Sequence, residues 1–448
     1  MKKVSIILWV GLLSVVPVYP QQTLTLEACR NLAIQNNKEL QISREQTNIA
    51  SYEKQAAFTK YFPELSASGA YLRNQKNILL AEPGVFGALG ALLPPEVNDL
   101  FRLDIQNIWI GGVSLVQPVF VGGKIVYYNQ IARYAKELAE AMNDTKLQDV
   151  ICRTDETYWQ IISLSNKKKL ADAYLQLLQK MHQDVEEMIT EGMATRAEGL
   201  SVKVKLNEAE MAKTKVENGL SLARMLLAQL CGLPDEEPVT LADESLTPAS
   251  STSQSVSEDQ TIDSRPELRS LALAVKIYKK KEDIALADLL PNVALSANYL
   301  ITNPSSFNGF KREFGGMFNA GLIVKLPLSA WWEGTHKRNM AKAETRIREL
   351  EYNNAREQIT LQLHQSVYRV NEARKKLIAS SRNTESAEEN LQHARIGFEE
   401  GVIPALNLME AQTAWVSAHS EQIDAQIEVK LAEVYLAKAA GKLTPNLD

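Results

Sequence analysis

Cysteine is scarce in this sequence. The 448 residues contain three cysteines, Cys29, Cys152 and Cys231, which are odd in number and far apart. This spacing argues against a disulfide framework and against a zinc site, because both need cysteines in sets with recognisable intervals. We therefore expect three buried thiols.

Positive charge is not in excess, and motifs for chemistry are missing. A formal net charge of -5 excludes a strongly basic nucleic-acid-binding protein, so we expect no nucleic-acid partner. The five histidines show no metal-ligand spacing, and there is no nucleophile elbow, phosphate-binding loop or zinc motif. The sequence therefore predicts a protein that is not an enzyme and that holds no cofactor and no metal.

Long apolar runs are confined to the N-terminus. Two lysines after Met1 precede VSIILWVGLLSVVPV, a pattern that predicts a signal peptide over residues 1–20. Leu26 to Cys29 resembles a lipoprotein cleavage box, but Glu27 and the distance from the apolar run argue against lipidation. Beyond the signal, no stretch approaches the roughly 18 apolar residues that a membrane-spanning helix needs. The protein is thus expected to be exported, as a soluble periplasmic protein, a secreted protein or a β-barrel.

Internal repetition is the strongest pattern that the sequence does contain. Gly192 in ITEGMATRAEGLSVKV and Gly401 in FEEGVIPALNLMEAQTAW are 209 residues apart (401 − 192). The same offset separates Gly232 from Gly441 and Pro118 from Pro327, and upstream YFPELSAS matches LLPNVALS. Shared offsets of this kind indicate two copies of one unit. Each copy is expected to contain a helix, a strand, an insertion, a second strand, a long helix, a break and a final helix.

Long helices are predicted by the spacing of apolar residues. One stripe follows steps of three and four residues: Leu147, Val150, Ile151, Thr154, Tyr158, Ile161 and Ile162. The helical segment from about Lys124 to Thr190 would extend roughly 100 Å at 1.5 Å per residue, so it must pack lengthwise in a coiled-coil-like bundle. On this feature alone, a soluble coiled-coil rod is the more common interpretation.

Alternating segments predict membrane strands. In PNVALSANYLIT and MFNAGLIVKLP, apolar side chains occupy every second position over about ten residues, as in a tilted membrane β-strand. Aromatic residues that would form interfacial girdles stand near the strand ends: Tyr71, Trp109, Phe120, Tyr299, Trp331 and Trp332. Four such strands cannot close a barrel alone, and lipid does not tolerate an open edge, so several chains would have to share one barrel.

The chain resembles the TolC-type outer-membrane efflux proteins. The resemblance rests on LTLEACRNLAIQNN, YFPELSASGAY, SLVQPVFVGGK, IVKLPLSAWWEGTHK and EGVIPALNLMEAQ, in this order and duplicated. It implies a mixed α and β membrane protein, a homotrimer with four strands per chain in one twelve-stranded barrel and a long periplasmic α-helical tunnel. It further implies a passive exit duct in the outer membrane, in contact with outer-membrane lipid. The duct would dock to a periplasmic adaptor protein and an inner-membrane pump of RND, ABC or MFS type.

The resemblance also assigns roles to the two helix breaks. Each would be a hairpin tip that docks the adaptor, with these residues: Gly192, Met193, Gly401, Val402, Ile403 and Pro404. Glycine would supply unusual backbone angles and relieve crowding, and Pro404 would sit in the first turn of the new helix. The family narrows the tunnel mouth with acidic side chains after the tips, which gives Glu198, Asn407 and Glu410 here. Asn407 departs from the family pattern of aspartate at this position, which weakens the expected cation ring.

The same pattern divides the chain into a signal peptide (1–20), a first repeat (21–232), a polar linker (233–264) and a second repeat (265–448). By resemblance, the linker would pack around the middle of the tunnel. The apolar insertion at 74–108 would fold across the barrel mouth or contact neighbouring chains, and the sequence does not decide between the two. The alternative function is a periplasmic coiled-coil structural or adaptor protein without its own channel, which explains only the helices.

Overall fold

The computed structural model describes residues 23–79, 102–103, 105–234, 240–245, 262 and 265–443. The predicted signal peptide, most of the insertion at 74–108 and most of the linker at 233–264 lie outside the described residues. Among the described helices, none is long and apolar enough to cross a membrane.

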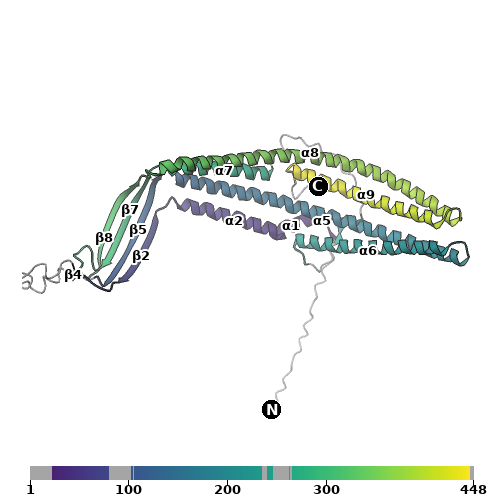
Figure 1. The fold of residues 1–448 in the computed structure, drawn as a ribbon, viewed down its shortest axis with the longest axis horizontal. Coiled ribbons are helices and arrows are strands. Elements are labelled where there is room, and N and C mark those ends of the chain that lie inside the picture. Colours follow the sequence, from purple (N-terminus) through teal and green to yellow (C-terminus); the bar gives the residue numbers. More distant parts are fainter. Residues whose placement is uncertain are drawn as a thin grey trace, which may run out of the picture. The chain divides into compact units, whose positions relative to one another are not determined.

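Helices form most of the described chain (Figure 1). They are α1 (Leu26–Asn36), α2 (Lys38–Thr59), α5 (Lys124–Thr190), α6 (Arg196–Cys231), α7 (Pro266–Ala287), α8 (Ala330–Glu399) and α9 (Ala405–Ala439), with a 3₁₀ helix at Ala242–Ser245. The strands are β1 (Thr23–Leu24), β2 (Glu64–Arg73), β3 (Ile78–Leu79), β4 (Arg102–Leu103), β5 (Asn107–Val121), β6 (Thr240–Leu241), β7 (Asn292–Asn303) and β8 (Gly315–Lys325). The prediction of a long helix from Lys124 to Thr190 is confirmed at both ends.

The chain forms two compact units. The first contains the described parts of residues 1–44, 142–266 and 356–448, and the second those of residues 45–141 and 267–355. Each unit contains segments from both predicted repeats. The boundaries between the units fall within α5, at residues 141 and 142, and within α8, at residues 355 and 356.

The core of the first unit is built on the predicted stripe of α5. Val150, Ile151, Thr154, Tyr158, Ile161 and Ile162 are all buried, with exposed fractions of 2% or less. Tyr158 and the two isoleucines pack with Leu220 and Leu227 of α6 and with Ile427 of α9. The apolar stripe thus faces partner helices, as its 3.6-residue period predicts.

Helix α1 is fixed to α5 by a buried ion pair. The Arg30 guanidinium donates two hydrogen bonds of 2.8 Å, from Nε and Nη2, to the two carboxylate oxygens of Asp155. Burial raises the pKa of the Asp155 carboxyl, and the guanidinium beside it acts in the opposite direction. Loss of one partner of such a pair leaves a buried, uncompensated charge, which typically costs about 3–5 kcal/mol.

The described part of the polar linker packs on the first unit. β1 and β6 form a short parallel pair, and Leu241 is buried. The Tyr158 hydroxyl donates a 2.6 Å hydrogen bond to Asp243, and Arg224 forms a 2.9 Å ion pair with Glu244. Residues 240–245 are therefore fastened to α5 and α6 by specific polar contacts.

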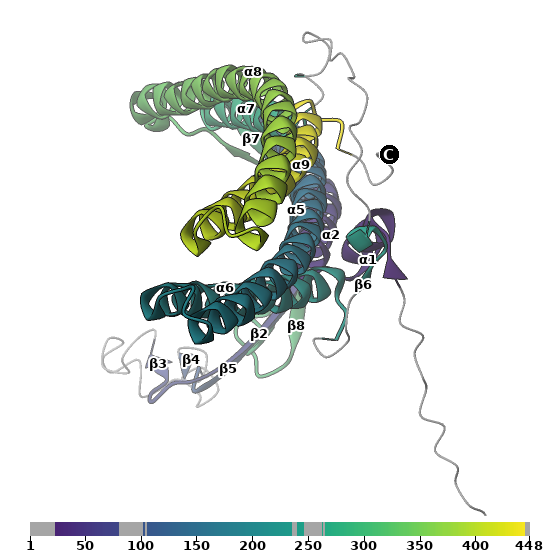
Figure 2. The same cartoon turned by 90° about the vertical axis from the view of Figure 1, so that its right-hand side faces the viewer.

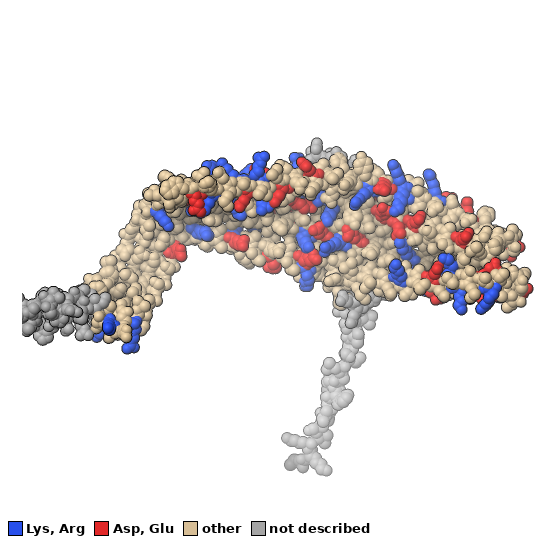
Figure 3. Space-filling model, viewed as in Figure 1, with Lys and Arg blue, Asp and Glu red and all other residues tan. Residues whose placement is uncertain are grey.

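The second unit contains a four-stranded antiparallel sheet in the order β2-β5-β7-β8. β2 and β8 are its edges (Figure 1). The register pairs Val293 with Val324 and Tyr299 with Phe318, so the faces predicted for these two strands are confirmed. Charged side chains are spread over the helices in Figure 3, whereas the visible surface of the strands carries few of them.

Candidate functional site

The two faces of the four-stranded sheet differ in chemistry. Residues paired across antiparallel strands lie on the same face of a sheet, so the register assigns every paired position to a face. One face, called the apolar face below, has an unbroken apolar middle: Leu65, Ala67, Gly69, Gly111, Val113, Leu115, Leu295, Ala297, Tyr299, Ile301, Phe318, Ala320, Leu322 and Val324. Its described polar members, Arg73, Asn107, Gln117 and Asn303, lie toward the strand ends.

The opposite face, called the polar face below, carries a row of hydroxyl and amide side chains across all four strands. The row pairs Ser66 with Ser114, Ser114 with Asn298 and Asn298 with Asn319. The Ser114 hydroxyl donates to Asn298 Oδ1 at 2.6 Å, and Asn298 Nδ2 donates to Asn319 Oδ1 at 3.0 Å. One face therefore suits hydrocarbon, whereas the other carries this polar row among apolar side chains such as Ile110, Leu300 and Met317.

Aromatic side chains mark both ends of the sheet. The Tyr71 and Trp109 rings contact each other with centroids 4.6 Å apart at one end, and Phe120 pairs with Val293 near the other. Trp109 and Phe120 are 11 positions apart (120 − 109), or roughly 36 Å along a strand at about 3.3 Å per residue. At a tilt of about 40° this spans roughly 28 Å, close to the ~25 Å apolar band of an outer-membrane strand.

The six aromatic residues expected at an interface are all exposed. Trp331 and Trp332 lie at the start of α8, just after β8 ends, at the same end of the strands as Phe120. Tyr299 lies elsewhere: it pairs with Val113 and Phe318, four positions along β7 from the partner of Trp109. A side chain added at Gly316, which pairs with Ile301, would strike the Tyr299 hydroxyl. The Tyr299 side chain thus extends from the middle of the strand toward the end that carries Trp109.

Two hairpin tips join the long helices in pairs, α5 to α6 and α8 to α9 (Figure 2). Gly192 and Gly401 have φ angles of 77° and 71°, the left-handed region that glycine adopts most readily. Both turns have the same hydrogen bonds 209 positions apart: Gly192 N–H to Ile189 O (3.1 Å), Met193 N–H to Met188 O (2.8 Å), Gly401 N–H to Phe398 O (3.0 Å) and Val402 N–H to Gly397 O (2.8 Å).

The backbone geometry alone explains these two glycines. Nothing lies within 4 Å of a Cβ placed at Gly192 or Gly401. The crowding that was expected as a second reason for glycine is therefore not found within one chain. Any side chain would still strain the left-handed turn.

The tip side chains divide into exposed and packed residues. Met193 and Val402 expose 65% and 73% of their surfaces, so both are available to a partner. Ile403 differs from the expectation of an exposed tip residue. It is partly buried and packs against the cluster of Phe398, Leu408 and Met409. The turn folds Ile403 back onto its own hairpin, which gives it a structural role.

The two helices that follow the tips begin differently. Thr195 caps α6, and Glu198 completes a capping box by accepting the Thr195 N–H at 2.7 Å. Pro404 is the residue that caps α9, which begins at Ala405, so the expectation that it sits in the first helical turn is wrong. Its ψ of 158° is extended, because the chain is still leaving the turn at this position. Without an N–H, Pro404 cannot form the backbone half of a capping box.

The candidate pore residues come from the first two turns of α6 and α9. Asn407 and Glu410 are exposed on α9, on the side opposite the buried Leu408 and Met409. Glu198 is held by its hydrogen bonds at the start of α6. Among the described residues, no hydrogen bond or ion pair joins Glu198 to either of the other two, so a ring would need several chains.

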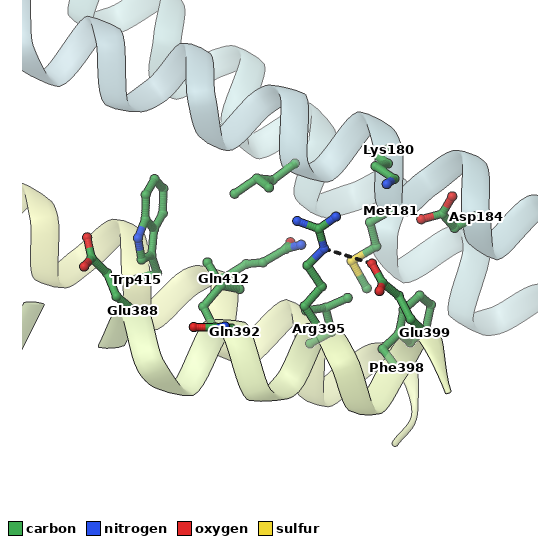
Figure 4. A pocket seen from close by; sticks show the side chains of 13 residues that line it. Lys180, Met181, Asp184, Glu388, Gln392, Arg395, Phe398, Glu399, Gln412 and Trp415 are labelled. Atoms are coloured by element: carbon green, nitrogen blue, oxygen red, sulfur yellow. Dashed lines mark hydrogen bonds and ion pairs between the residues drawn. The ribbon is translucent and has the colours of Figure 1, made fainter. Parts of the chain in front are cut away.

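A groove that the sequence did not predict lies between α5 and the α8–α9 hairpin (Figure 4). Its volume is about 350 Å³, and its lining is mixed: Leu177, Lys180, Met181, Asp184, Glu388, Leu391, Gln392, Arg395, Phe398, Glu399, Leu408, Gln412 and Trp415. Gln412 is 3% exposed, and its Oε1 has no hydrogen-bond partner among the described residues. Sequence patterns could not locate this groove, because its lining comes from three helices.

The chain is similar in sequence to a known family and to a characterised protein. A sequence model of the outer membrane efflux protein family matches residues 29–233 and 259–442. Alkaline protease secretion protein AprF of Pseudomonas aeruginosa is 23% identical over 343 residues, covering 75% of this chain and 70% of that protein.

Solved structures show the same fold. The outer-membrane channel OprN superposes with a TM-score of 0.77 at 17% identity, covering 93% of this chain and 89% of that chain. The CmeC outer membrane channel of Campylobacter jejuni superposes with a TM-score of 0.75 at 15% identity, covering 94% and 87%.

Proposed function

The chain belongs to the outer membrane efflux protein family, and on this premise we propose that it is the outer-membrane exit duct of a tripartite efflux or type I secretion system. The family consists of outer-membrane channel proteins, so an outer-membrane location and a transport role follow directly. The observation that carries the proposal is the four-stranded sheet with one apolar and one polar face.

The sheet requires partners if it lies in lipid. Among the described strands, β2 and β8 each have one neighbour in the sheet, so the outer edge of each has a row of backbone N–H and C=O groups with no described strand to pair with. Water is not available in the hydrocarbon core to satisfy them, and only a closed barrel removes both edges. Three copies would supply twelve strands (3 × 4) in one barrel, so we infer a homotrimer. The apolar face would contact outer-membrane lipid, and the polar face would line the lumen.

The long helices would form the wall of a tunnel through the periplasm. At 1.5 Å per residue, the 67 residues of α5 extend roughly 100 Å. We infer that the chain contains two copies of one helix-hairpin unit. The matched turns at Gly192 and Gly401 support this, as do the helix ends at Gly232 and Gly441, where the same pair of hydrogen bonds recurs 209 positions apart.

The tips would be the docking surface for the periplasmic adaptor. Met193 and Val402 support this role, because they are apolar side chains left exposed at the ends of their hairpins. An inner-membrane pump of RND, ABC or MFS type would load the duct. A relative named for alkaline protease secretion favours polypeptide cargo.

The mouth of the tunnel is predicted to select cations moderately. Three chains with Glu198 and Glu410 would place six carboxylates (3 × 2) around one constriction, where a narrow passage concentrates the electric field. Carboxylates within a Debye length of about 8 Å of each other would add to the same negative potential. Glu198→Gln with Glu410→Gln should lower the cation-to-anion permeability ratio by a factor of about 2 or more. Asn407→Asp adds three carboxylates and should raise the ratio. Reversal potentials of purified protein in a planar bilayer under a salt gradient measure this.

Glutamine is the appropriate replacement for Glu198, because a capping box accepts glutamine as well as glutamate. The capping box at the N-terminus of α6 should therefore still form in the Glu198→Gln variant. If the double variant kept the ion preference of the parent, the two glutamates would not form the selective ring. The duct assignment itself would be unaffected by that result.

A further inference from the structure

Two of the three cysteines meet in the core of the first unit. Cys29 lies in α1 and Cys231 is the last residue of α6, so 202 positions separate them (231 − 29). Both side chains are 0% exposed and belong to one apolar cluster. The Cys231 thiol donates to the carbonyl oxygen of Cys29 at 3.6 Å, so the sulfur of one cysteine lies against the backbone of the other.

The surrounding contacts fix the positions of α1 and α6 beside the two cysteines. Asn36 Nδ2, at the end of α1, donates a 3.0 Å hydrogen bond to the Cys231 carbonyl oxygen. Gly232 ends α6 directly after the cysteine with a φ of 69°. On the other side, Arg30 is fixed to Asp155 by two buried hydrogen bonds. Both helices are thus anchored within one residue of the cysteines.

The third cysteine has a different environment. Cys152 packs with Ile151 and Leu443 in a separate cluster, and its thiol donates to Glu156 Oε1 at 3.4 Å. Burial raises the pKa of the Cys152 thiol to about 12. Among the described residues that pack with Cys152 in this cluster there is no second cysteine, so Cys152 serves as an internal control.

We propose that Cys29 and Cys231 form a disulfide bond in the exported protein, and that Cys152 stays a thiol. The proposal rests on the proposed outer-membrane location, because disulfides form and persist in the oxidising periplasm. The electron acceptor is the active-site disulfide of an exported thiol–disulfide oxidoreductase.

The exchange balances in two steps. One cysteine thiolate attacks a sulfur of the oxidoreductase disulfide, which forms a mixed disulfide and releases one oxidoreductase thiolate. The second cysteine thiolate then attacks the sulfur of the first cysteine and releases the other oxidoreductase thiolate. Two protein thiols have lost two protons and two electrons, and the oxidoreductase disulfide has become a dithiol.

The bond must form before the core closes. In the folded unit, the neighbouring Cys231 thiol and burial raise the pKa of the Cys29 thiol well above its usual range. Both thiols are 0% exposed in the folded unit, so an oxidoreductase cannot reach them there, and oxidation belongs to the stage when α1 has not yet packed. Once formed, the bond would be shielded, and reductant should break it only after unfolding.

The test counts thiols in protein isolated from outer membranes. The full chain is alkylated with iodoacetamide in denaturant without reductant, digested and analysed by mass spectrometry. We expect one alkylated cysteine per chain, Cys152, and one cross-linked peptide pair that contains Cys29 and Cys231. Three alkylated cysteines in outer-membrane protein would overturn the disulfide and leave the proposed function intact.

Two variants make the count specific. Cys152→Ser should contain no alkylatable cysteine before reduction, and Cys29→Ser should contain two, Cys152 and Cys231. Two alkylated cysteines in Cys152→Ser would again overturn the disulfide. Fractionation of the same cells separates the two proposals. A chain that is absent from the outer membrane would contradict the proposed function, whatever its thiol count. It would also remove the basis of the proposed disulfide.

Discussion

Ala320→Arg should prevent the protein from accumulating in the outer membrane, whereas Gly321→Arg should leave it assembled. The two residues are neighbours on β8, and both are exposed in the single chain. Ala320 pairs with Ala297 on the apolar face, close to the middle of the predicted membrane span. A buried arginine at mid-membrane costs about 2–4 kcal/mol on the lipid face of a barrel strand, and a trimer would carry three.

Gly321 is a matched control because it lies on the polar face. It pairs with Ser296, and nothing stands within 4 Å of a Cβ at this position. Its arginine would extend into a water-filled lumen. Heat-resistant oligomer in purified outer membranes, measured by unheated gel electrophoresis, reports assembly of each variant. Equal yields of Ala320→Arg and Gly321→Arg oligomer would show that the apolar face does not contact lipid.

Val402→Glu and Met193→Glu should each abolish transport while the oligomer still assembles. Both side chains are largely exposed at the tips, so a charge there costs the free protein little. If an adaptor covers the tips, the same charge is buried without a partner, at a cost of several kcal/mol per site. Cell survival under a challenge with the transported compound, or secretion of the cargo protein, measures transport once the cargo is known.

Two further substitutions separate docking from folding. Val402→Thr keeps the size of the side chain without a charge and should retain transport. Ile403→Glu should reduce the amount of folded protein, because Ile403 packs against the cluster that includes Phe398 and Leu408. Full transport by assembled Val402→Glu would remove the tips as the docking surface.

The elements of the fold could be predicted from the sequence because their patterns are long. The stripe from Leu147 to Ile162 predicted the buried face of α5, and the helix ends expected at about Lys124 and Thr190 are observed. The alternation in β7 and β8 predicted the correct faces, because a shift of the register by one residue would move every apolar side chain to the opposite face. The helix breaks were placed correctly because a glycine followed by a new helical pattern marks a turn.

Single residues were harder to predict, because their roles depend on neighbours that are distant in sequence or on exact backbone angles. The position of Pro404 depends on where the turn ends, which helix propensity fixes only within one or two residues. Ile403 looked exposed because its packing partners are not evident from the sequence pattern. The contact between Cys29 and Cys231, 202 positions apart, has no local signal. For the same reason, the groove beside Gln412 could not be anticipated.

The size of the assembled particle tests the central claim most directly, because the unpaired edges of β2 and β8 demand neighbours in lipid. Native mass spectrometry of the protein, extracted from outer membranes in mild detergent, measures the number of chains per particle. We predict three chains per particle, with no folded monomer at any protein concentration that can be measured. A stable, folded monomer that retains its sheet would contradict the shared barrel and the duct that depends on it.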